Sequence, residues 1–453
     1  MPRSPHEDTD IQRTRLTQAQ LDEVLARHKQ FVRRAGGTRA KLVLADLSGL
    51  DFRGADLSDA EFSGSKFEEA NLRGCTLNRC NLYSADLRRA DMTGAELSRA
   101  DVRGACLRGA ILTDAIMIET DLRDGVMVAN GDDGELKPIS YEVTKTEVSS
   151  AKMNGANLTG ARMANAICQQ TDLSDAILKN AKLIRCDLSR SDLTGCSLSG
   201  ADLTGADLTG VNFAGADLTG ITVERATLAN ANLVGAVFDA FTFSGVDLST
   251  AKMLRSLTSL DQPLEDALKR HIRWVKTNGK EGKRGDLSEI NLSQIDLSGA
   301  ALSAVVMRCT SLKDADLRAA QLAMADLSVA DLRRADLTKA DLRGANFQRA
   351  TLTGAKLVAV RMSPVDINGA AAMQWRANLM RARLQECDFR QADLSGANLA
   401  FADLSRADLR GCNLEGANLT QANLRSAQVD GCLFHGADLS GVDICTTIGT
   451  PKR

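Results

Sequence analysis

The chain repeats a unit of five residues. Residues 200–220 read GADLTGADLTGVNFAGADLTG. A period of five matches neither the 3.6 residues of a helical turn nor the alternation of a strand. Each unit has one large residue, Leu or Phe at a position termed i, and one small residue at i−2. We expect both to point inward, in a solenoid whose backbone groups pair between successive coils.

Position i recurs in four series that together hold 72 units and about four fifths of the chain. The series run from Leu42 to Met127, from Val143 to Met253, from Leu287 to Ile367 and from Leu379 to Ile444, with 18, 23, 17 and 14 repeats. Self-similarity at a fixed period predicts a repeat architecture and outweighs any estimate of domain number from length.

The succession of Ala-Asp-Leu and Ala-Asn-Leu units resembles the pentapeptide-repeat family. The resemblance implies an all-β solenoid, a right-handed quadrilateral β-helix with one pentapeptide per side and four per coil. The period alone would also permit three sides. With four sides, residues 20 apart stack in adjacent coils, so Asp187 would lie beside Asp207, and Asp296, Asp316 and Asp336 would form a column.

Two segments leave the repeat, and their apolar residues follow the i, i+3, i+4, i+7 spacing of an amphipathic helix. The predicted helix residues are Leu21, Leu25, His28 and Phe31 in the first, and Leu264, Leu268, His271 and Trp274 in the second. We expect Thr17 and Asp261 as N-caps and the glycines Gly36 and Gly279 at the C′ positions. Each helix would cap the N-terminal end of a solenoid segment, where backbone and apolar surface would otherwise be exposed.

The second helix aligns with the first, His271 with His28 and Trp274 with Phe31, and each is followed by an interrupted pentapeptide series. The chain therefore looks like a duplicated module whose interruptions correspond. The predicted organisation is a polar N-terminal tail (1–15), capping helix 1 (16–36), solenoid 1 (37–256, with a break near 128–140), capping or connecting helix 2 (257–282), solenoid 2 (283–446, with a break near 368–376) and a tail (447–453).

After Ile444 the sequence CTTIGTPKR is too short and polar for a helical lid. We therefore expect the C-terminal end of solenoid 2 to be covered by self-association or by a partner. In the first break, NGDDGELKP has the Asp and Gly density of a calcium loop but lacks its full spacing, which favours a surface turn. In the second, Trp375 is either packed against a coil or an exposed anchor for a partner.

The sequence predicts no catalytic site, cofactor or metal ion. His28 and His271 fall on apolar helix stripes, where packing is the favoured role. Seven cysteines replace the Ala of the repeat and predict buried reduced thiols: Cys75, Cys80, Cys186, Cys196, Cys387, Cys412 and Cys432. A divalent ion bridging an aspartate column is a less favoured alternative to a solvated polar face. We expect a protein that is not an enzyme.

Net charge is −2, but residues 1–256 carry −5 and residues 257–453 carry +3. Without a run of 18 apolar residues or the apolar core of a signal peptide, we expect no transmembrane segment and a cytoplasmic location. The favoured function is a scaffold presenting a rod-like surface to an unknown protein partner. The candidate partner surface comprises Arg270, Arg273, Lys276, Trp375, Asp187 and Asp207.

Two alternative functions stay open. Some members of the pentapeptide-repeat family mimic duplex DNA and bind type II topoisomerases such as gyrase. This chain departs from that pattern in its mixed charge and in its C-terminus, and only residues 186–250 are acidic enough. The second alternative is peripheral attachment to an anionic membrane through the basic helix faces. We do not expect direct binding to nucleic acid.

Overall fold

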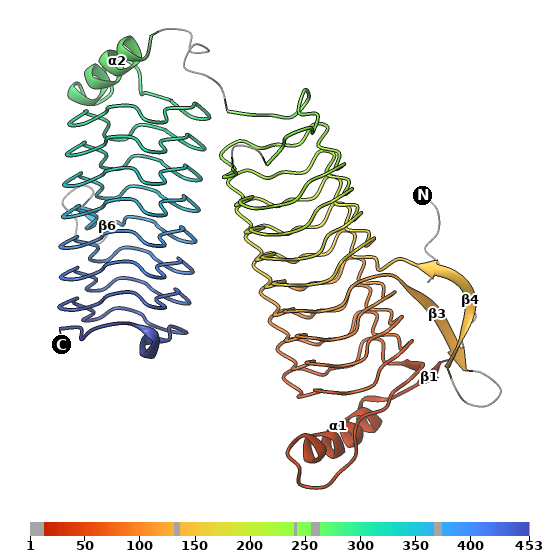
Figure 1. Cartoon of the computed structure of the whole chain (residues 1–453). Coiled ribbons are helices and arrows are strands. Elements are labelled where there is room, and N and C mark those ends of the chain that lie inside the picture. The colour runs from red at the N-terminus through yellow and green to blue at the C-terminus, as the bar shows by residue number, and fades with distance from the viewer. Residues whose placement is uncertain (1–12, 131–135, 240–241, 255–262, 367–373, 453) are drawn as a thin grey trace. The chain divides into compact units, whose positions relative to one another are not determined.

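The computed structural model describes residues 13–130, 136–239, 242–254, 263–366 and 374–452 (Figure 1). The chain divides into two compact units. Unit 1 consists of Met1–Asn232 and Val237–Lys252, and unit 2 consists of Met253–Arg453 with the stretch Leu233–Ala236. Within each unit the chain winds as a stack of coils, with a helix at the N-terminal end of the stack (Figure 1).

Successive coils are joined by parallel backbone bridges between residues 20 apart, such as Asp187 with Asp207. Around this pair, Leu188 donates its N–H to the carbonyl of Asp207 at 2.9 Å, and Asp207 donates to that of Cys186 at 3.0 Å. This spacing equals four pentapeptides, so each coil contains four. The expected column of Asp296, Asp316 and Asp336 is confirmed by the same bridges.

The bridges stay isolated because the chain turns at every fifth residue. At the corner after Leu203, the N–H of Ala206 bonds to the carbonyl of Leu203 at 2.9 Å, and Gly205 has φ +67°. This positive φ at the third position is that of a type II turn. Many corners carry a residue with a side chain at the same position, such as Arg190 with φ +60°.

The interior of each unit is filled by the large residue at i and the small residue at i−2. All seven cysteines predicted at the Ala position are buried and unpaired by disulfides. Threonine at this position keeps its hydroxyl satisfied: Thr120 donates to the carbonyl of Leu97 at 2.8 Å, and Thr310 to that of Leu287 at 2.7 Å. Position i−2 therefore accepts a small side chain that is either apolar or able to form its hydrogen bond with the backbone of the solenoid.

The first break contains a β-hairpin, and the surface turn predicted within Asn130–Pro138 falls on its loop. Its strands β3 (Gly125–Asn130) and β4 (Leu136–Thr144) are antiparallel, and the loop residues 131–135 lie outside the described residues. Met127 and Val143 had been assigned to the repeat, but they lie in these strands, and Val143 is 62% exposed. Because of the insertion, Cys106 bridges to Glu147 instead of to the residue four pentapeptides further on.

The second break also inserts a hairpin, with the short strands β5 (Val365–Asp366) and β6 (Gln374–Trp375). Ile367, the predicted end of the third series, lies outside the described residues. Here Asn346 bridges to Asn378, so the ladder again skips the inserted segment. Each unit therefore carries one hairpin that leaves its stack of coils.

The two hairpins leave their units at slightly different heights. In unit 1 the column of bridges that starts at Lys41 completes four coils at Asp121, and the insertion follows before the column continues at Arg162. In unit 2 the ladder of bridges starts at Asp286 and the insertion follows Arg361. The chain has by then completed one side fewer than four coils. The interruptions thus correspond only to within one side of a coil.

Helix α1 (Gln18–Val32) begins as predicted with Thr17 as N-cap, in a capping box with Gln20. Helix α2 (Leu264–Lys276) has Pro263 as its N-cap, and Asp261 lies outside the described residues. Preceding α1, β1 (Thr14–Arg15) pairs in parallel with β2 (Ala45–Asp46).

The ends of both helices differ from the prediction. At the C′ positions the structure places Arg34 (φ +54°) and Asn278 (φ +50°), where the sequence suggested Gly36 and Gly279. The N–H groups of Ala35 and Gly279 bond back to the carbonyls of Gln30 and Trp274, which completes a Schellman motif in each case.

The predicted solenoid ends also need correction. In unit 1 the last bridge joins Asn232 to Lys252, and Met253 is exposed. In unit 2, Ile444 lies in the 3-10 helix η2 (Ile444–Thr446) instead of an inward repeat position. Beyond it, Ile448 bridges to Gln428 and Lys452 to Leu433, so much of the predicted tail continues the ladder. Among the described residues, no helix is long and apolar enough to span a membrane.

Replacing the fully buried Leu337 with Ala is expected to cost about 2–5 kcal/mol through lost contacts and a cavity. Because each coil contacts only its neighbours, amide hydrogen exchange should accelerate in unit 2 and stay unchanged in unit 1. The control is Met324→Ala at an exposed corner, which should change little. Equal acceleration in both units would contradict this picture.

Candidate binding surface

Two buried histidines receive backbone N–H groups at the N-terminal ends of the units. Nδ1 of His28 accepts the N–H of Ala40 at 3.1 Å, and Nδ1 of His271 accepts that of Gly285 at 3.0 Å. Within the stack, the equivalent N–H closes a corner by donating to the preceding repeat, as Ala60 does to the carbonyl of Leu57 at 3.0 Å. The first side of a unit has no preceding repeat, so an imidazole nitrogen supplies the missing acceptor.

Burial lowers the pKa of both histidines and favours the neutral ring. For His28, the carboxylates of Asp56 and Asp59 and the backbone of Ser58 oppose this lowering of the pKa, and Arg39 adds to it. For His271, the backbone of Ser303 opposes the lowering of the pKa and Arg284 adds to it. Since Nδ1 accepts a hydrogen bond in each case, the ring proton lies on Nε2, which has no partner of normal geometry among the described residues.

The other predicted helix residues surround these rings. Phe31 stacks on His28 at 5.7 Å between ring centroids but is 39% exposed, and Trp274 stacks on His271 at 6.0 Å. Leu21 is fully buried and Leu25 half-buried under α1. Leu264 and Leu268 are half-buried and pack against the core of unit 2. The aligned residues of the two helices thus make the same kind of contacts.

Aspartate at i−1 closes a local turn with its own side chain. Oδ1 of Asp187 accepts the backbone N–H of Ser189 at 3.0 Å and its hydroxyl at 2.7 Å. This Asx turn recurs along both units and gives a physical reason for Asp or Asn at i−1, because both offer the acceptor. In the described part of the chain, no group of three or more His, Cys, Asp or Glu residues could hold a metal ion.

Where arginine follows at i+1, it pairs with the aspartate of its own repeat. Arg318 contacts both carboxylate oxygens of Asp316, and together with the backbone N–H of Arg318 it lowers the pKa of Asp316 to about 2. The signal for this ion pair in the sequence is the run Asp-Leu-Arg, as at residues 316–318. In residues 186–220 Ser or Thr takes this place, so Asp187, Asp192, Asp207 and Asp217 have no ion pair among the described residues.

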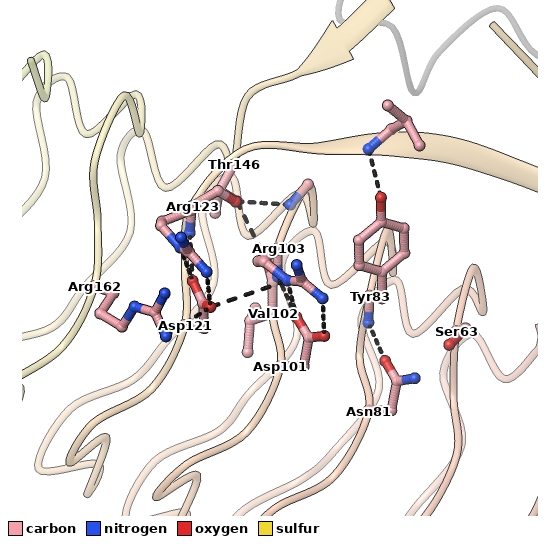
Figure 2. Close-up of polar contacts among 12 residues, drawn as sticks. Ser63, Asn81, Tyr83, Asp101, Val102, Arg103, Asp121, Arg123, Thr146 and Arg162 are labelled. Carbon is pink, nitrogen blue, oxygen red and sulfur yellow. Dashed lines mark hydrogen bonds and ion pairs between the residues drawn. The ribbon is translucent and has the colours of Figure 1, made fainter. Parts of the chain in front are cut away.

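The β3–β4 hairpin is fixed at its base by a polar cluster on the flank of unit 1 (Figure 2). The hydroxyl of Tyr83 accepts the N–H of Val126 at 2.8 Å, and the guanidinium of Arg103 lies 5.3 Å from the centre of the Tyr83 ring. The Thr146 hydroxyl accepts the N–H of Gly104 at 2.8 Å and donates to the carbonyl of Arg123 at 2.6 Å. These bonds tie both ends of the hairpin to adjacent coils.

The arginines of this cluster are held by carboxylates. Arg103 pairs with Asp101 at 2.7 Å and Arg123 with Asp121 at 2.8 Å, and Arg162 approaches Asp121 to 3.6 Å (Figure 2). The charges are therefore largely balanced within the cluster. We infer that this polar cluster positions the β3–β4 hairpin.

The remaining predicted surface residues are exposed in separate places. Trp375 is 52% exposed, and a Cβ added to Gly344 would lie 2.9 Å from its Cδ1. One edge of the indole therefore packs on the coil while the rest faces solvent. Arg270, Arg273 and Lys276 are exposed on α2 and make no ion pair among the described residues, whereas Lys269 pairs with Glu265 at 2.8 Å.

The family model for pentapeptide repeats matches well over half of the chain. The matches cover residues 40–124, 146–180, 186–224, 286–322, 325–363 and 377–441. The chain belongs to the pentapeptide-repeat family. Pentapeptide-repeat proteins fold as right-handed β-helices and are in general non-enzymatic structural or binding proteins.

Several solved pentapeptide-repeat structures are similar to this chain. HetL of the cyanobacterium Nostoc, involved in heterocyst differentiation regulation, is 18% identical over 92% of this chain and 93% of its own, with a TM-score of 0.28. QnrB1, a plasmid-mediated fluoroquinolone resistance protein, is 21% identical over 44% and 85%, with a TM-score of 0.25. Rfr23 of Cyanothece is 23% identical over 31% and 88%, with a TM-score of 0.22. No curated protein sequence matches the chain.

We expect the histidine bonds to weaken in acid. A histidine whose pKa is lowered on folding stabilises the folded state fully above its unfolded pKa of about 6.5, and this stabilisation is lost as the pH falls below that value. After correction for intrinsic exchange, protection of the Ala40 and Gly285 amides should therefore fall as the pH drops below about 6.5. His28→Gln and His271→Gln should remove this pH dependence, while His435→Gln, at an exposed site, should not.

Tyr83→Phe should loosen the hairpin base, because it removes the acceptor of the Val126 N–H but keeps the ring under Arg103. The lost hydrogen bond corresponds to about 1 kcal/mol, or roughly fivefold faster exchange of the Val126 amide. Exchange of the Gly104 amide, bonded to Thr146, serves as the internal control. Unchanged exchange at Val126 would show that Tyr83 does not hold the hairpin.

Proposed function

We propose that this protein is a non-enzymatic scaffold that presents rigid solenoid faces to a protein partner. The observation that supports this proposal is that many outward aspartates are held within their own repeats, by Asx turns such as Asp187 with Ser189 and by ion pairs such as Asp316 with Arg318. A surface ordered before binding loses little side-chain entropy on association. Such a surface is suited to binding a protein on a flat face and less suited to catalysis, which needs a cleft.

In this proposal each unit is a right-handed, four-sided β-helix, capped at its N-terminal end by α1 or α2. The four-pentapeptide spacing of the bridges supports four sides, and the handedness follows the family. The N–H···Nδ1 bonds of His28 and His271 support the capping role. At the other end of unit 2, Ile444 and the 56% exposed Ile448 support coverage by self-association.

The scaffold proposal is tested by affinity capture from native lysate, followed by reconstitution with the purified partner. We expect a stoichiometric complex, with its interface located by cross-linking on solenoid faces or on α2. A variant with Arg270, Arg273 and Lys276 changed to Glu separates binding through α2 from binding through the coils. If sedimentation finds only the chain itself, alone or self-associated, then the partner proposal fails.

A second candidate, DNA mimicry directed at a type II topoisomerase, is favoured by one observation. Asp172 with Asp192, and Asp187 with Asp207, form adjacent carboxylate pairs whose repeats have no arginine at i+1. Both columns are interrupted in the next coil, by Asn212 and Thr227. DNA mimicry predicts that the chain alters gyrase supercoiling and that changing Asp187 and Asp207 to Asn abolishes the effect. No effect would eliminate this candidate.

Peripheral membrane attachment has weaker support. The exposed cations of α2 favour anionic surfaces, but Leu264 and Leu268 already pack against the core of unit 2. An interfacial helix needs an apolar face for the lipid as well as charge. Salt-sensitive co-sedimentation with anionic vesicles would support attachment.

A further inference from the structure

Four consecutive coils on one face of unit 2 differ in chemistry from the rest of the unit. This part of the face is formed by four stacked pentapeptides, ANFQR, ANLMR, ANLAF and ANLTQ, which span 345–349, 377–381, 397–401 and 417–421. We call this the asparagine face. None of its residues is a carboxylate, but Asp326 and Asp438 continue the same column at its two ends. Aspartates paired with arginines lie on other faces, Asp341 with Arg343 on an adjacent face and Asp388 with Arg390 on the opposite face.

The asparagines of this face form a continuous ladder. Nδ2 of Asn378 donates to Oδ1 of Asn346 at 3.2 Å, Asn398 donates to Asn378 at 3.2 Å, and Asn418 donates to Asn398 at 3.3 Å. Each Oδ1 also accepts the backbone N–H two residues on, as for Met380 on Asn378. The ladder uses one N–H of each amide, so a second donor per coil is available to acceptors on a bound chain.

Aromatic and cationic side chains occupy the two corners that border the asparagine face. On one side, Trp375 and the exposed Arg376 precede Asn378. On the other, the guanidinium of Arg381 lies 5.0 Å from the ring centre of Phe401, which is 44% exposed. Trp and Arg are enriched among residues that dominate binding energy, and interface centres are depleted of charge.

We propose that the asparagine face binds an acidic segment of a partner protein. Carboxylates of that segment would contact Arg376 and Arg381, its apolar or aromatic side chains would pack on Trp375 and Phe401, and its carbonyls would accept from the amide ladder.

We choose an acidic segment because of charge. Residues 374–381 and the other three pentapeptides hold Arg349, Arg376 and Arg381 and no carboxylate. Nearby carboxylates along the sequence and the column include Glu415, at the corner before 417–421, and Asp326 and Asp438 at the two ends. This inference rests on the proposed scaffold function and names its partner chemistry.

The size of the asparagine face favours a segment over a second copy. Four coils at about 4.8 Å span about 19 Å, and a five-residue side is at most about 17 Å wide. The resulting area of roughly 320 Å² falls well short of the ~800 Å² per partner that a stable protein interface buries. A segment of about six extended residues covers the length of the face.

The test is selection of random 12-residue peptides on the full-length protein, followed by fluorescence anisotropy with an enriched peptide. We expect enriched peptides to combine Asp or Glu with an aromatic or aliphatic residue. Trp375→Ala and Arg381→Glu should each weaken binding at least tenfold, and added salt should weaken it further. Arg390→Glu, on another face of unit 2, is the matched control and should leave binding unchanged.

A second variant tests the asparagine ladder itself, because substitutions of Trp375 and Arg381 can also disturb packing at the corners. Asn398→Asp preserves the acceptor that closes the turn but removes the ladder donor and adds a negative charge, so it should also weaken binding. Asn413→Asp makes the same change on a different face and should have no effect. Equal effects at the two positions, peptides without acidic residues, or no enrichment would each overturn the proposal.

The outcomes also separate this inference from the scaffold function. If a captured stoichiometric partner binds the Trp375→Ala and Asn398→Asp variants as tightly as the unaltered chain, then the scaffold remains and the asparagine face is not its site. If no partner forms a complex at all, then the scaffold function itself fails.

Discussion

The backbone hydrogen bonds between residues 20 apart are the interaction on which the rest of the structure depends. They require each coil to hold four pentapeptides, and this in turn requires a corner with positive φ after each short face. Once the corners are fixed, every side chain has an assigned direction: i and i−2 inward, i−1 and i+1 outward. Composition then follows from geometry, because a narrow interior takes Leu with Ala, Cys or Thr and the corner accepts Gly, Asn or Arg.

The same regularity creates a problem at the ends of each unit, and the chain solves it differently at its two kinds of end. At the N-terminal ends, a neutral imidazole on an amphipathic helix accepts the N–H that the first side cannot pair, in the same way at His28 and His271. At the C-terminal end of unit 2, the ladder continues through Ile448 to Lys452 without a helix.

Much of the coil follows from the sequence, because a strict period determines which residues stack. Asp187 beside Asp207, the buried cysteines and the buried histidines were all predicted correctly. The hairpins were not, since Val143 fits the period yet lies exposed in β4. The asparagine face could not be predicted from the five-residue period either. Four pentapeptides after Asn346 comes Asp366, and only the insertion places Asn378 there instead.

The two insertions leave and re-enter the coil at a corner without changing the bridges on either side. Cys106 and its partner Glu147 are 41 apart in sequence, and Asn346 and Asn378 are 32 apart, where an uninterrupted coil has 20. Neither difference is a multiple of five, so the core places no condition on what is inserted. Each corner is therefore a separate insertion site, specified by its coil and by one of the four sides of that coil. A chain of this kind can acquire a new recognition element at a chosen site without redesigning its interior. Such a protein can therefore gain a binding element by insertion at a corner, whereas a pocket changes only when the residues that line it are replaced.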